Sequence, residues 1–389
     1  MGNNMLGMGS DRIMRTKKLK AISLFSGAGG MDIGVSEAGF DTLACIEQDI
    51  FCCETLRHNF KREGKKTKVI EDDIRNIDPD SLMNELGIKR GEVDLLYGGS
   101  PCQSFSQIGK MESLKDERGL LLFQMIRFAK AIKPKAIFIE QVKGLLNARD
   151  YNGHAGGVLD MLLSDLKDLG YQIKWKVINA ADYGVTQLRK RVFVVAVRSG
   201  IKFDFPPPTH GSQEFSLPLF SVKPYFTVGE AIKGLGTPEK KNEGAREDSH
   251  IDVTPAGDKL RIHGVPEGSF LAAQIHLPKE QVQNLTKKDT TKYLRLSRSR
   301  PANTLRGGEI FFHPIENRYL TPREYMRIHG YPDNYVLKGP IRSRSGRVKN
   351  LDQHRQVANS VPPPVAKAIA NNIAKVLKCR KYSKSLVTA

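Results

Sequence analysis

Apolar and polar positions follow a regular order through the first half of the chain. Short, nearly continuous apolar runs, typical of buried strands, occupy residues 21–25, 42–46, 93–97, 136–139, 171–178 and 192–197. Helical periods lie at residues 31–38, 120–132 and 158–169. Strands that alternate with helices predict an α/β fold built on an open, doubly wound parallel sheet.

The first apolar run leads into a glycine loop, S-G-A-G-G, at residues 26–30. Asp32 occupies the position of the third glycine of the dinucleotide fingerprint, which argues against a pyrophosphate ligand. Glu47 ends the second strand, 20 residues after Gly27, and an acid there can accept hydrogen bonds from ribose hydroxyls. The acidic run 71–73 follows the third strand, where a carboxylate could meet an adenine amino group. These positions together predict an adenosine-containing ligand.

A thiol and a carboxyl follow the next two strands. Cys102 comes directly after Pro101, whose ring restrains the direction of the chain, and Glu140 stands at the carboxyl end of the fifth strand. Open α/β sheets place their chemistry at that end, so the two side chains are predicted to share a site. The alternative for Cys102 is an inert buried thiol. The polar segment 104–118 is predicted to be a lid that closes over a substrate.

The pattern changes after the last of these strands. From residues 205–208 to about 295 the sequence is rich in Gly, Pro and Lys, which predicts a smaller, irregular domain. A helix is expected at 227–232 and another from Thr321 and Pro322 to His329. The apolar face of 362–377 predicts a last helix that packs on the first domain. The predicted division is 19–198 plus 354–380, 199–320, a bridging segment at 321–353 and a flexible arm at 1–18.

The charge of the 389-residue chain narrows the choice of partner. A net charge of +19 and a pI near 9.6 favour a polyanion, and nucleic acid is the first candidate. Arg189 and Arg191 alternate on the approach to a strand and are predicted to point to one face, a solvated basic edge being the alternative. The basic segment 338–349 is either a solvated linker or a phosphate contact.

Several classes of protein are excluded by what the sequence lacks. No run of 18 apolar residues predicts a transmembrane helix, and residues 1–20 contain no signal-peptide core, so no membrane association and a cytoplasmic location are expected. The five cysteines form no C-x-x-C pair, which predicts a reducing compartment, no disulfides and no metal site.

Seven motifs, in one order, give the chain a family resemblance. L-F-S-G-A-G-G, I-E-Q-D, G-G-S-P-C-Q-S-F-S, I-E-Q-V-K-G-L, Q-L-R-K-R, R-P-A-N-T-L and Q-V-A-N-S-V-P-P-P-V resemble those of the DNA (cytosine-5) methyltransferases of the restriction–modification type. The resemblance spans residues 19 to 376. It implies a Rossmann-like S-adenosylmethionine-dependent methyltransferase sheet with a smaller target-recognition domain. It also implies methyl transfer to carbon 5 of a flipped cytosine in a specific duplex DNA sequence.

The resemblance also assigns roles to residues, motif by motif. It implies that S-adenosyl-L-methionine is held by Phe25, Gly27, Gly29, Gly30, Glu47, Asp73, Asn359 and Ser360. It implies catalytic roles for Cys102 as nucleophile, Glu140 as acid, and Arg189 and Arg191. It implies a substrate loop that includes Pro101, Gln103, Ser104, Ser106 and Gln187. One position departs from the family, which usually has Asn where this chain has Gln141.

The expected partner is double-stranded DNA, bound by a monomer, with a cognate restriction endonuclease as a further partner. Three alternatives stay open at this point. An RNA cytosine-5 methyltransferase is disfavoured because no Cys-Phe-Thr tripeptide of the transfer-RNA branch is present. A non-catalytic DNA-binding regulator is disfavoured by the retention of Cys102, Glu140, Arg189 and Arg191 together. An amino-methylating DNA enzyme would carry Pro-Pro and an aromatic residue where this chain has Pro101-Cys102.

Overall fold

The fold is taken from a computed structural model, which describes residues 18–101, 121–212, 222–240, 247–274, 292–342 and 350–387. Several sequence-based expectations fall outside these ranges. Those are the nucleophile and loop residues Cys102, Gln103, Ser104 and Ser106, the predicted lid at 104–118, nearly all of the predicted arm at 1–18, and most of the basic segment 338–349.

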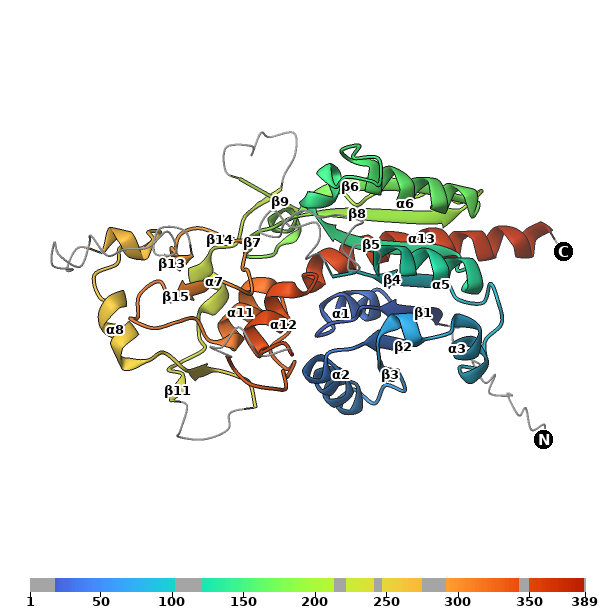
Figure 1. Cartoon of the computed structure of the whole chain (residues 1–389). Coiled ribbons are helices and arrows are strands. Elements are labelled where there is room, and N and C mark those ends of the chain that lie inside the picture. Colours follow the sequence, from blue (N-terminus) through green and yellow to red (C-terminus); the bar gives the residue numbers. More distant parts are fainter. Residues whose placement is uncertain are drawn as a thin grey trace, which may run out of the picture.

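A seven-stranded sheet forms the centre of the larger domain, with the strand order β3-β2-β1-β4-β5-β8-β6 (Figure 1). The strands are β1 Leu19–Leu24, β2 Phe40–Glu47, β3 Lys68–Glu71, β4 Leu95–Gly98, β5 Ala136–Val142, β6 Tyr171–Asn179 and β8 Lys190–Arg198. β3, β2, β1, β4 and β5 are parallel, whereas β8 is antiparallel to both β5 and β6. The α/β fold is as predicted, but the prediction of a parallel sheet is wrong for β8, the one strand of the seven that runs in the opposite direction. Only residues 180–189 join β6 to β8, and a parallel crossover needs about a dozen residues or more.

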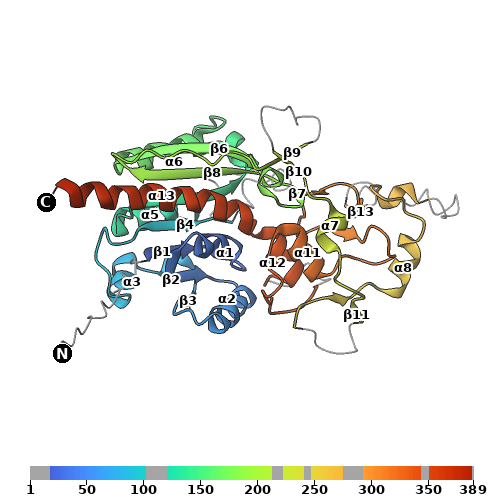
Figure 2. The same ribbon diagram turned by 180° about the vertical axis from the view of Figure 1, so that it is seen from behind.

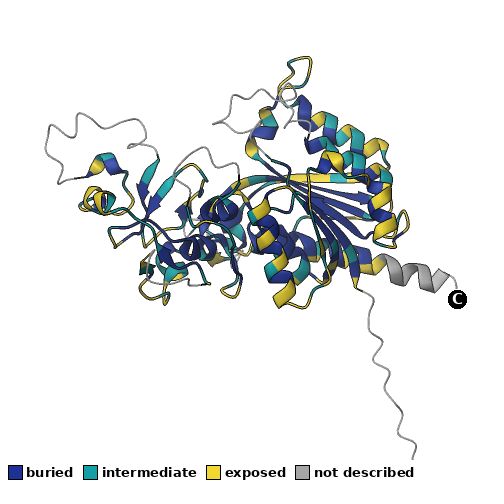
Figure 3. Cartoon of the chain, turned by 60° about the horizontal axis from the view of Figure 1, so that its bottom comes forward, coloured by how far each residue is buried: buried dark blue, intermediate teal, exposed yellow. Residues whose placement is uncertain are grey.

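Helices cover both faces of this sheet, and each face has its own apolar core. The helices are α1 Gly30–Glu37, α2 Ile50–Arg62, α3 Pro79–Glu85, α5 Gln124–Ile132, α6 Gly157–Asp168 and α13 Pro363–Val387, with short 3₁₀ turns η1 Ile74–Asn76, η3 Leu121–Phe123, η4 Lys143–Asn147 and η5 Ala180–Tyr183. α3, α5 and α6 pack on one face through Leu82, Phe128 and Leu162. α1 and α13 pack on the other through Val35 and Ile369. The central strands β1, β4 and β5 are accordingly buried on both sides, whereas the edge strands β3 and β6 carry exposed residues, as do the outer faces of the helices (Figure 3).

The last helix reaches back to the first one. Figure 2 shows α13 lying along the sheet beside α1. The two helices come into close contact at Gly34, where an added Cβ would lie 2.5 Å from both the Pro363 carbonyl oxygen and the Lys367 backbone nitrogen. These helix backbone atoms cannot shift to make room for a methyl group, whereas the end of a flexible side chain can. The absence of a side chain at Gly34 therefore allows the C-terminal segment to reach the loop that precedes α1.

Gly34→Ala is expected to destabilise the protein by about 1–3 kcal/mol, the usual cost of overpacking a close contact. The measurement is the urea midpoint of unfolding, with the slope checked for two-state behaviour. Gly257→Ala is the matched control, because Gly257 is also helical, in α8 Ala256–Ile262, and nothing lies within 4 Å of its Cβ position. The control is expected to be neutral or slightly stabilising. Equal midpoints for the two variants would contradict the close approach of α1 and α13.

The smaller domain has little regular structure. Its short strands, with β7 at the junction, are β7 Gln187–Leu188, β9 His210–Gly211, β10 Lys223–Pro224, β11 Glu239–Lys240, β12 Ile251–Asp252, β13 Tyr293–Arg295, β14 Ala302–Asn303 and β15 Ile310–Phe312. Its helical segments, with α11 and α12 at the junction, are α7 Val228–Ile232, α8, η7 Leu271–Ala273, α11 Pro322–His329 and α12 Gln353–Asn359. One core joins this region to the sheet domain, because Leu294, Met326 and Val357 pack in the same cluster as Ala28 and Cys52.

Helix α11 lies between the two domains (Figure 1). Its predicted start is confirmed: Thr321 is the N-cap, with a capping box to Glu324, and Pro322 stands in the first turn. Glu324 also accepts two hydrogen bonds from Arg318, at 2.7 and 2.8 Å, although both side chains are buried. Removing one partner would leave a buried charge unpaired, so this pair anchors the start of the helix.

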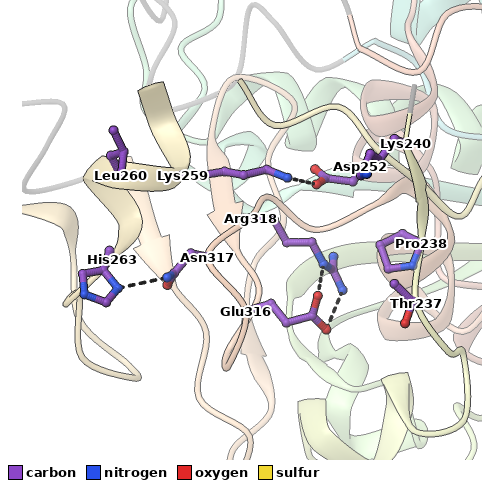
Figure 4. Close-up of a pocket in the computed structure, with 10 residues that line it drawn as sticks. All are labelled: Thr237, Pro238, Lys240, Asp252, Lys259, Leu260, His263, Glu316, Asn317 and Arg318. Carbon is purple, nitrogen blue, oxygen red and sulfur yellow. Dashed lines mark hydrogen bonds and ion pairs between the residues drawn. The ribbon is translucent and has the colours of Figure 1, made fainter. Parts of the chain in front are cut away.

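The smaller domain also contains a polar pocket of about 480 Å³ (Figure 4). Six of its charged and polar side chains pair with one another: Lys259 with Asp252 at 2.7 Å, Arg318 with Glu316 at 2.7 Å, and His263 with Asn317 at 3.1 Å. Every lining residue belongs to the region 237–318, away from the sheet edge. In the described part of the chain, no helix is long and apolar enough to cross a bilayer.

Candidate active site

The ends of β4 and β5 form the floor of the candidate site. The two strands are adjacent and parallel, as predicted, and their pairing ends at Gly98 and Ile139. Glu140 is the next residue of β5, while β4 turns through Gly99 towards Pro101. β5 itself continues to Val142 because its other neighbour, β8, keeps pairing with it. The turn that leads to Cys102 therefore starts beside Glu140.

Glu140 is a buried carboxyl with one charged partner. Its side chain is 11% exposed, and its Oε1 lies 3.1 Å from Nε of Arg191. Burial raises the pKa of Glu140, and the positive charges of Arg191 and then Arg189 oppose that rise. The other oxygen, Oε2, faces Gly99, where an added Cβ would lie 2.9 Å away. Such a carboxyl can hold a proton and donate it to a basic atom of a substrate bound next to it.

Gly99→Ala is expected to displace the Glu140 carboxyl and to lower kcat by up to about 10²-fold, because small misplacements of a catalytic group have large effects. Gly99 does not have a positive φ, so alanine adds the contact without backbone strain. Methyl transfer to DNA is measured at saturating donor, together with Tm. Gly257→Ala again serves as the control. An unchanged kcat in a folded Gly99→Ala protein would count against the placement of Oε2.

Gln141 reaches the turn before Cys102. Its Nε2 donates to the carbonyl oxygen of Ser100 at 3.1 Å and to Ser100 Oγ at 2.9 Å, and its Oε1 accepts from the Val142 backbone at 2.8 Å. The side chain is 1% exposed, so these bonds are shielded from water. The longer side chain at this departure from the family pattern thus spans the distance from β5 to Ser100. The sequence alone left its role open.

The two arginines of Q-L-R-K-R make different contacts. Arg191 is paired with Glu140, as described above. Arg189 is 2% exposed and donates to the carbonyl oxygens of Ser360, at 3.1 Å, and Leu305, at 3.4 Å. Gln187 is also buried, and its Oε1 accepts from the Leu305 backbone at 3.1 Å. Arg191 therefore reaches the carboxyl, whereas Gln187 and Arg189 bind the segments that join the domains.

The glycine loop at the end of β1 faces open space at Gly27, whereas Gly29 and Gly30 pack against protein atoms. Phe25 and Gly27 have φ values of 57° and 54°, and nothing lies within 4 Å of the position of a Cβ on Gly27. A left-handed φ at a residue other than glycine costs about 1–3 kcal/mol, and such residues cluster at functional sites. Glu47 holds this shape, because its Oε2 accepts from the Gly27 backbone at 2.7 Å. The loop fits a ligand that lies against its backbone.

Glu47 has capacity left for a ligand. Its Oε1 accepts from the backbone of Gln48 and Asp49, at 2.8 and 2.9 Å. With the bond from Gly27, three of the roughly four acceptor positions of a carboxylate are used. Burial raises the pKa of Glu47, and the bonds from Asp49 and Gly27 oppose that rise. The remaining position is the one that a ribose hydroxyl would need.

The other expected cofactor residues lie around the same loop or follow β3, which is separated from β1 by β2. Asp73 follows β3, caps η1 through the Arg75 backbone, and pairs with the Arg75 guanidinium at 2.7 Å, which lowers its pKa. Ser360 is buried with its Cβ 3.0 Å from the Cβ position of Gly30, whereas Asn359 is exposed. Gly29 packs against the hydroxyl of Tyr335, which donates to the Ala28 carbonyl at 2.9 Å.

Two contributors near the site were missed by sequence reasoning. Tyr335 supports the glycine loop from a segment about 300 residues later in the chain. His329 is fully buried between Gln187 and Ser360. Neither had a usable signal, because an aromatic residue after a helix and a histidine at its end are both ordinary core residues. Within the described ranges, no cluster of three metal-ligating side chains occurs, and the four cysteines found there are free.

Comparison with known proteins assigns the chain to a family. The family model for C-5 cytosine-specific DNA methylases matches residues 19–375. The type II methyltransferase M.NgoFVII of Neisseria gonorrhoeae is 32% identical over 366 residues, which cover 92% of this chain and 87% of the relative. M.PspPI of Psychrobacter sp. is 34% identical over 379 residues, covering 93% and 80%.

A solved structure shows the same fold. A prophage-encoded DNA modification methyltransferase of E. coli superposes with a TM-score of 0.67 at 22% identity, over 92% of this chain and 99% of the other. The motif order, the mixed sheet and the family match agree with one another. The chain therefore belongs to the C-5 cytosine-specific DNA methylases, enzymes that transfer a methyl group to carbon 5 of cytosine in DNA.

Proposed function

We propose that this enzyme uses S-adenosyl-L-methionine to methylate one cytosine within a specific duplex DNA sequence, with Cys102 as nucleophile and Glu140 as acid. The observation that carries the proposal is the position of Glu140. It is a buried carboxyl with a raised pKa, it is paired with Arg191, and it lies beside the turn that leads to Cys102. Activation of a cytosine ring requires a thiol nucleophile and a carboxyl that can donate a proton. Here the carboxyl lies beside the turn that leads to the thiol.

Carbon 5 of cytosine is too weak a nucleophile to take a methyl group unaided. Attack of the Cys102 thiolate forms a bond to carbon 6, and the ring electrons move towards nitrogen 3, which takes a proton from Glu140. The product is an enamine whose carbon 5 is nucleophilic and accepts the methyl group. A solvent water then takes the carbon 5 proton, the bond from sulfur to carbon 6 breaks so that the thiolate departs and the ring is restored, and nitrogen 3 returns its proton to Glu140.

The neighbouring side chains have supporting roles in this scheme. Arg191 holds the Glu140 carboxyl in place and limits the rise of its pKa. Gln141 restrains Ser100, and with Pro101 it sets the direction from which the chain approaches Cys102. A free thiol has a pKa of about 8.5, so a nearby cation is needed to raise the thiolate fraction, and Arg191 is our candidate.

The cofactor residues fit a nucleoside bearing a charged tail. When bound, S-adenosyl-L-methionine supplies an electrophilic methyl group. Glu47 would accept from one ribose hydroxyl through its remaining acceptor position, and Asp73 would accept from the adenine amino group. The loop of Phe25, Gly27, Gly29 and Gly30 would pack along the ligand. Asn359 and Ser360 would face its amino-acid end, since Ser360 lies beside Gly30.

The duplex is proposed to lie between the two domains. A base must leave the stack to reach the sheet edge, at a cost of a few kcal/mol. We assign catalysis and cofactor binding to residues 19–198 with 354–380, target recognition to 199–320 and bridging to 321–353. The protein is proposed to act as a monomer on cytoplasmic, nucleoid DNA. The relatives named above are type II methyltransferases, which supports a restriction–modification role and a cognate endonuclease as partner.

Two measurements test this function. Incubation with a methyl-labelled donor is expected to label duplex DNA and not transfer RNA, and the product should be 5-methylcytosine. Bisulfite sequencing of DNA from a host that expresses the protein should then show one methylated cytosine in one recurring sequence. Label in transfer RNA, or a product that runs as N4-methylcytosine or N6-methyladenine, would overturn the proposal.

A further inference from the structure

A fully buried histidine stands where three distant segments of the chain meet. His329 is the last residue of α11, and Gly330 ends the helix in a left-handed conformation. The Nδ1 atom of His329 lies 3.0 Å from Nε2 of Gln187, and its Nε2 atom lies 3.0 Å from the Ser360 carbonyl oxygen. The imidazole therefore fills the space between the Q-L-R-K-R segment and the segment that precedes α13.

The hydrogen bonds at this junction have only one consistent direction. The Leu305 backbone N–H donates to Oε1 of Gln187, so the amide NH₂ of Gln187 faces the imidazole. Nδ1 of His329 must therefore be an acceptor, without a proton. The proton resides on Nε2, which donates to the carbonyl of Ser360. A neutral His329 imidazole in this single tautomer gives the Gln187 amide an acceptor and the Ser360 carbonyl a donor.

The charges around the ring favour the same state. Burial, together with the positive charges of Arg189 and Arg191, holds the pKa of His329 well below its usual range. Arg189 donates to the same Ser360 carbonyl at 3.1 Å. The carbonyl of Ser360 thus receives two donors, one neutral and one charged, and both come from outside its own segment.

We propose that His329 is a positioning residue that links two segments of the active site. One carries Gln187 and Arg189 on the DNA-binding side, and the other carries Ser360 on the cofactor side. At one end His329 holds Gln187, two residues before Arg189. At the other it holds Ser360, whose Cβ packs 3.0 Å from the Cβ position of Gly30 in the glycine loop. This inference rests on the proposed function, since it takes the cofactor roles of Gly30 and Ser360 from it. It adds His329 as the residue that fixes the position of one segment relative to the other.

His329→Leu is expected to weaken binding of S-adenosylhomocysteine about tenfold, because a buried carbonyl and a buried amide each lose a partner and tenfold corresponds to about 1.4 kcal/mol. His329→Gln should stay within about threefold of wild type, because its amide can donate to Ser360 and accept from Gln187. The dissociation constant is measured by calorimetry on the full-length protein, and KM for DNA and kcat are measured beside it. A purely structural loss would not be rescued by glutamine.

The matched control is His250→Leu. His250 is also fully buried and also contacts α11, but at the opposite end, through Thr321 Oγ1 at 2.9 Å. It should lose stability as His329→Leu does while keeping the affinity for S-adenosylhomocysteine. If His329→Leu does not fold, Gln187→Leu replaces it. The Gln187 side chain bonds to His329 and to the Leu305 backbone, so this substitution should weaken the same affinity through His329.

The possible results distinguish a failure of this inference from a failure of the proposed function. A wild-type protein that binds S-adenosylhomocysteine, with His329→Leu or Gln187→Leu binding it equally well, would overturn the inference alone. Equal losses in His329→Leu, His329→Gln and His250→Leu would do the same, since they would show a general loss of packing. A wild-type protein that does not bind S-adenosylhomocysteine would overturn the proposed function and this inference with it.

Discussion

Glu140→Gln is expected to lower kcat for DNA methylation by about 10²–10⁴-fold, the range typical of a positioned general acid. Glutamine keeps the size of the side chain and can still accept from Arg191, but it has no acidic proton for ring nitrogen 3. The protein should fold, bind the donor and bind DNA, so KM should change much less than kcat. Steady-state rates with labelled donor give kcat and KM, and single-turnover rates, which exclude product release, show whether the chemical step carries the loss.

The pH dependence of stability provides a second check on the same residue. Burial raises the pKa of Glu140 above its ordinary value of 4.5, so the folded state holds the proton more tightly than the unfolded state. Its contribution to stability is complete below about pH 4.5 and is lost as the pH rises through the folded-state pKa. Glu140→Gln removes this loss, so relative to wild type it should gain stability as the pH rises from 5 to 8.

Glu92→Gln is the control for both measurements. Glu92 is 44% exposed, pairs with Lys20 at 3.2 Å and lies far from the sheet edge that carries Glu140. It should leave kcat unchanged, because an exposed ion pair contributes little. A Glu140→Gln enzyme that keeps more than about a tenth of wild-type kcat would show that nitrogen 3 is protonated by another group.

Cys102→Ser is expected to abolish measurable methylation while leaving folding, donor binding and DNA binding intact. A serine hydroxyl is close in size to a thiol, so the turn held by Gln141 through Ser100 need not move. It lacks the acidity that makes a thiolate available near neutral pH. Without a bond to carbon 6, carbon 5 stays too weak to take the methyl group, and no other residue in the proposed site supplies that bond.

Trapping of the covalent adduct measures this step directly. DNA with 5-fluorocytosine at the target position should give a stable protein–DNA adduct with the wild-type enzyme, because fluorine cannot leave as a proton does. The Cys102→Ser protein should give none under the same conditions. Glu140→Gln should still form the adduct, more slowly. An adduct in Cys102→Ser would place the nucleophile elsewhere in the chain.

The strands, the glycine loop and the order of the chemical groups could be predicted because they depend on local pattern. Apolar runs gave β1, β4 and β5 within a few residues, and a strand that ends in an acid identified Glu47. The capping box of α11 was readable from Thr321 and Pro322 for the same reason. Helix α2 was not predicted, because its buried positions include Cys52, Cys53 and Asn59 rather than a clear aliphatic stripe.

The direction of β8 and the contacts between distant side chains were decided only by the tertiary structure. The antiparallel course of β8 depends on its pairing with β5 and β6, which no local period reports. Arg189 and Arg191 look equivalent in sequence, yet one binds Ser360 and the other Glu140, because each meets a different distant segment. Gln141 and His329 acquire their roles in the same way. Sequence alone therefore determined which chemical groups the protein carries and the strands they follow, while long-range packing decided which of them meet.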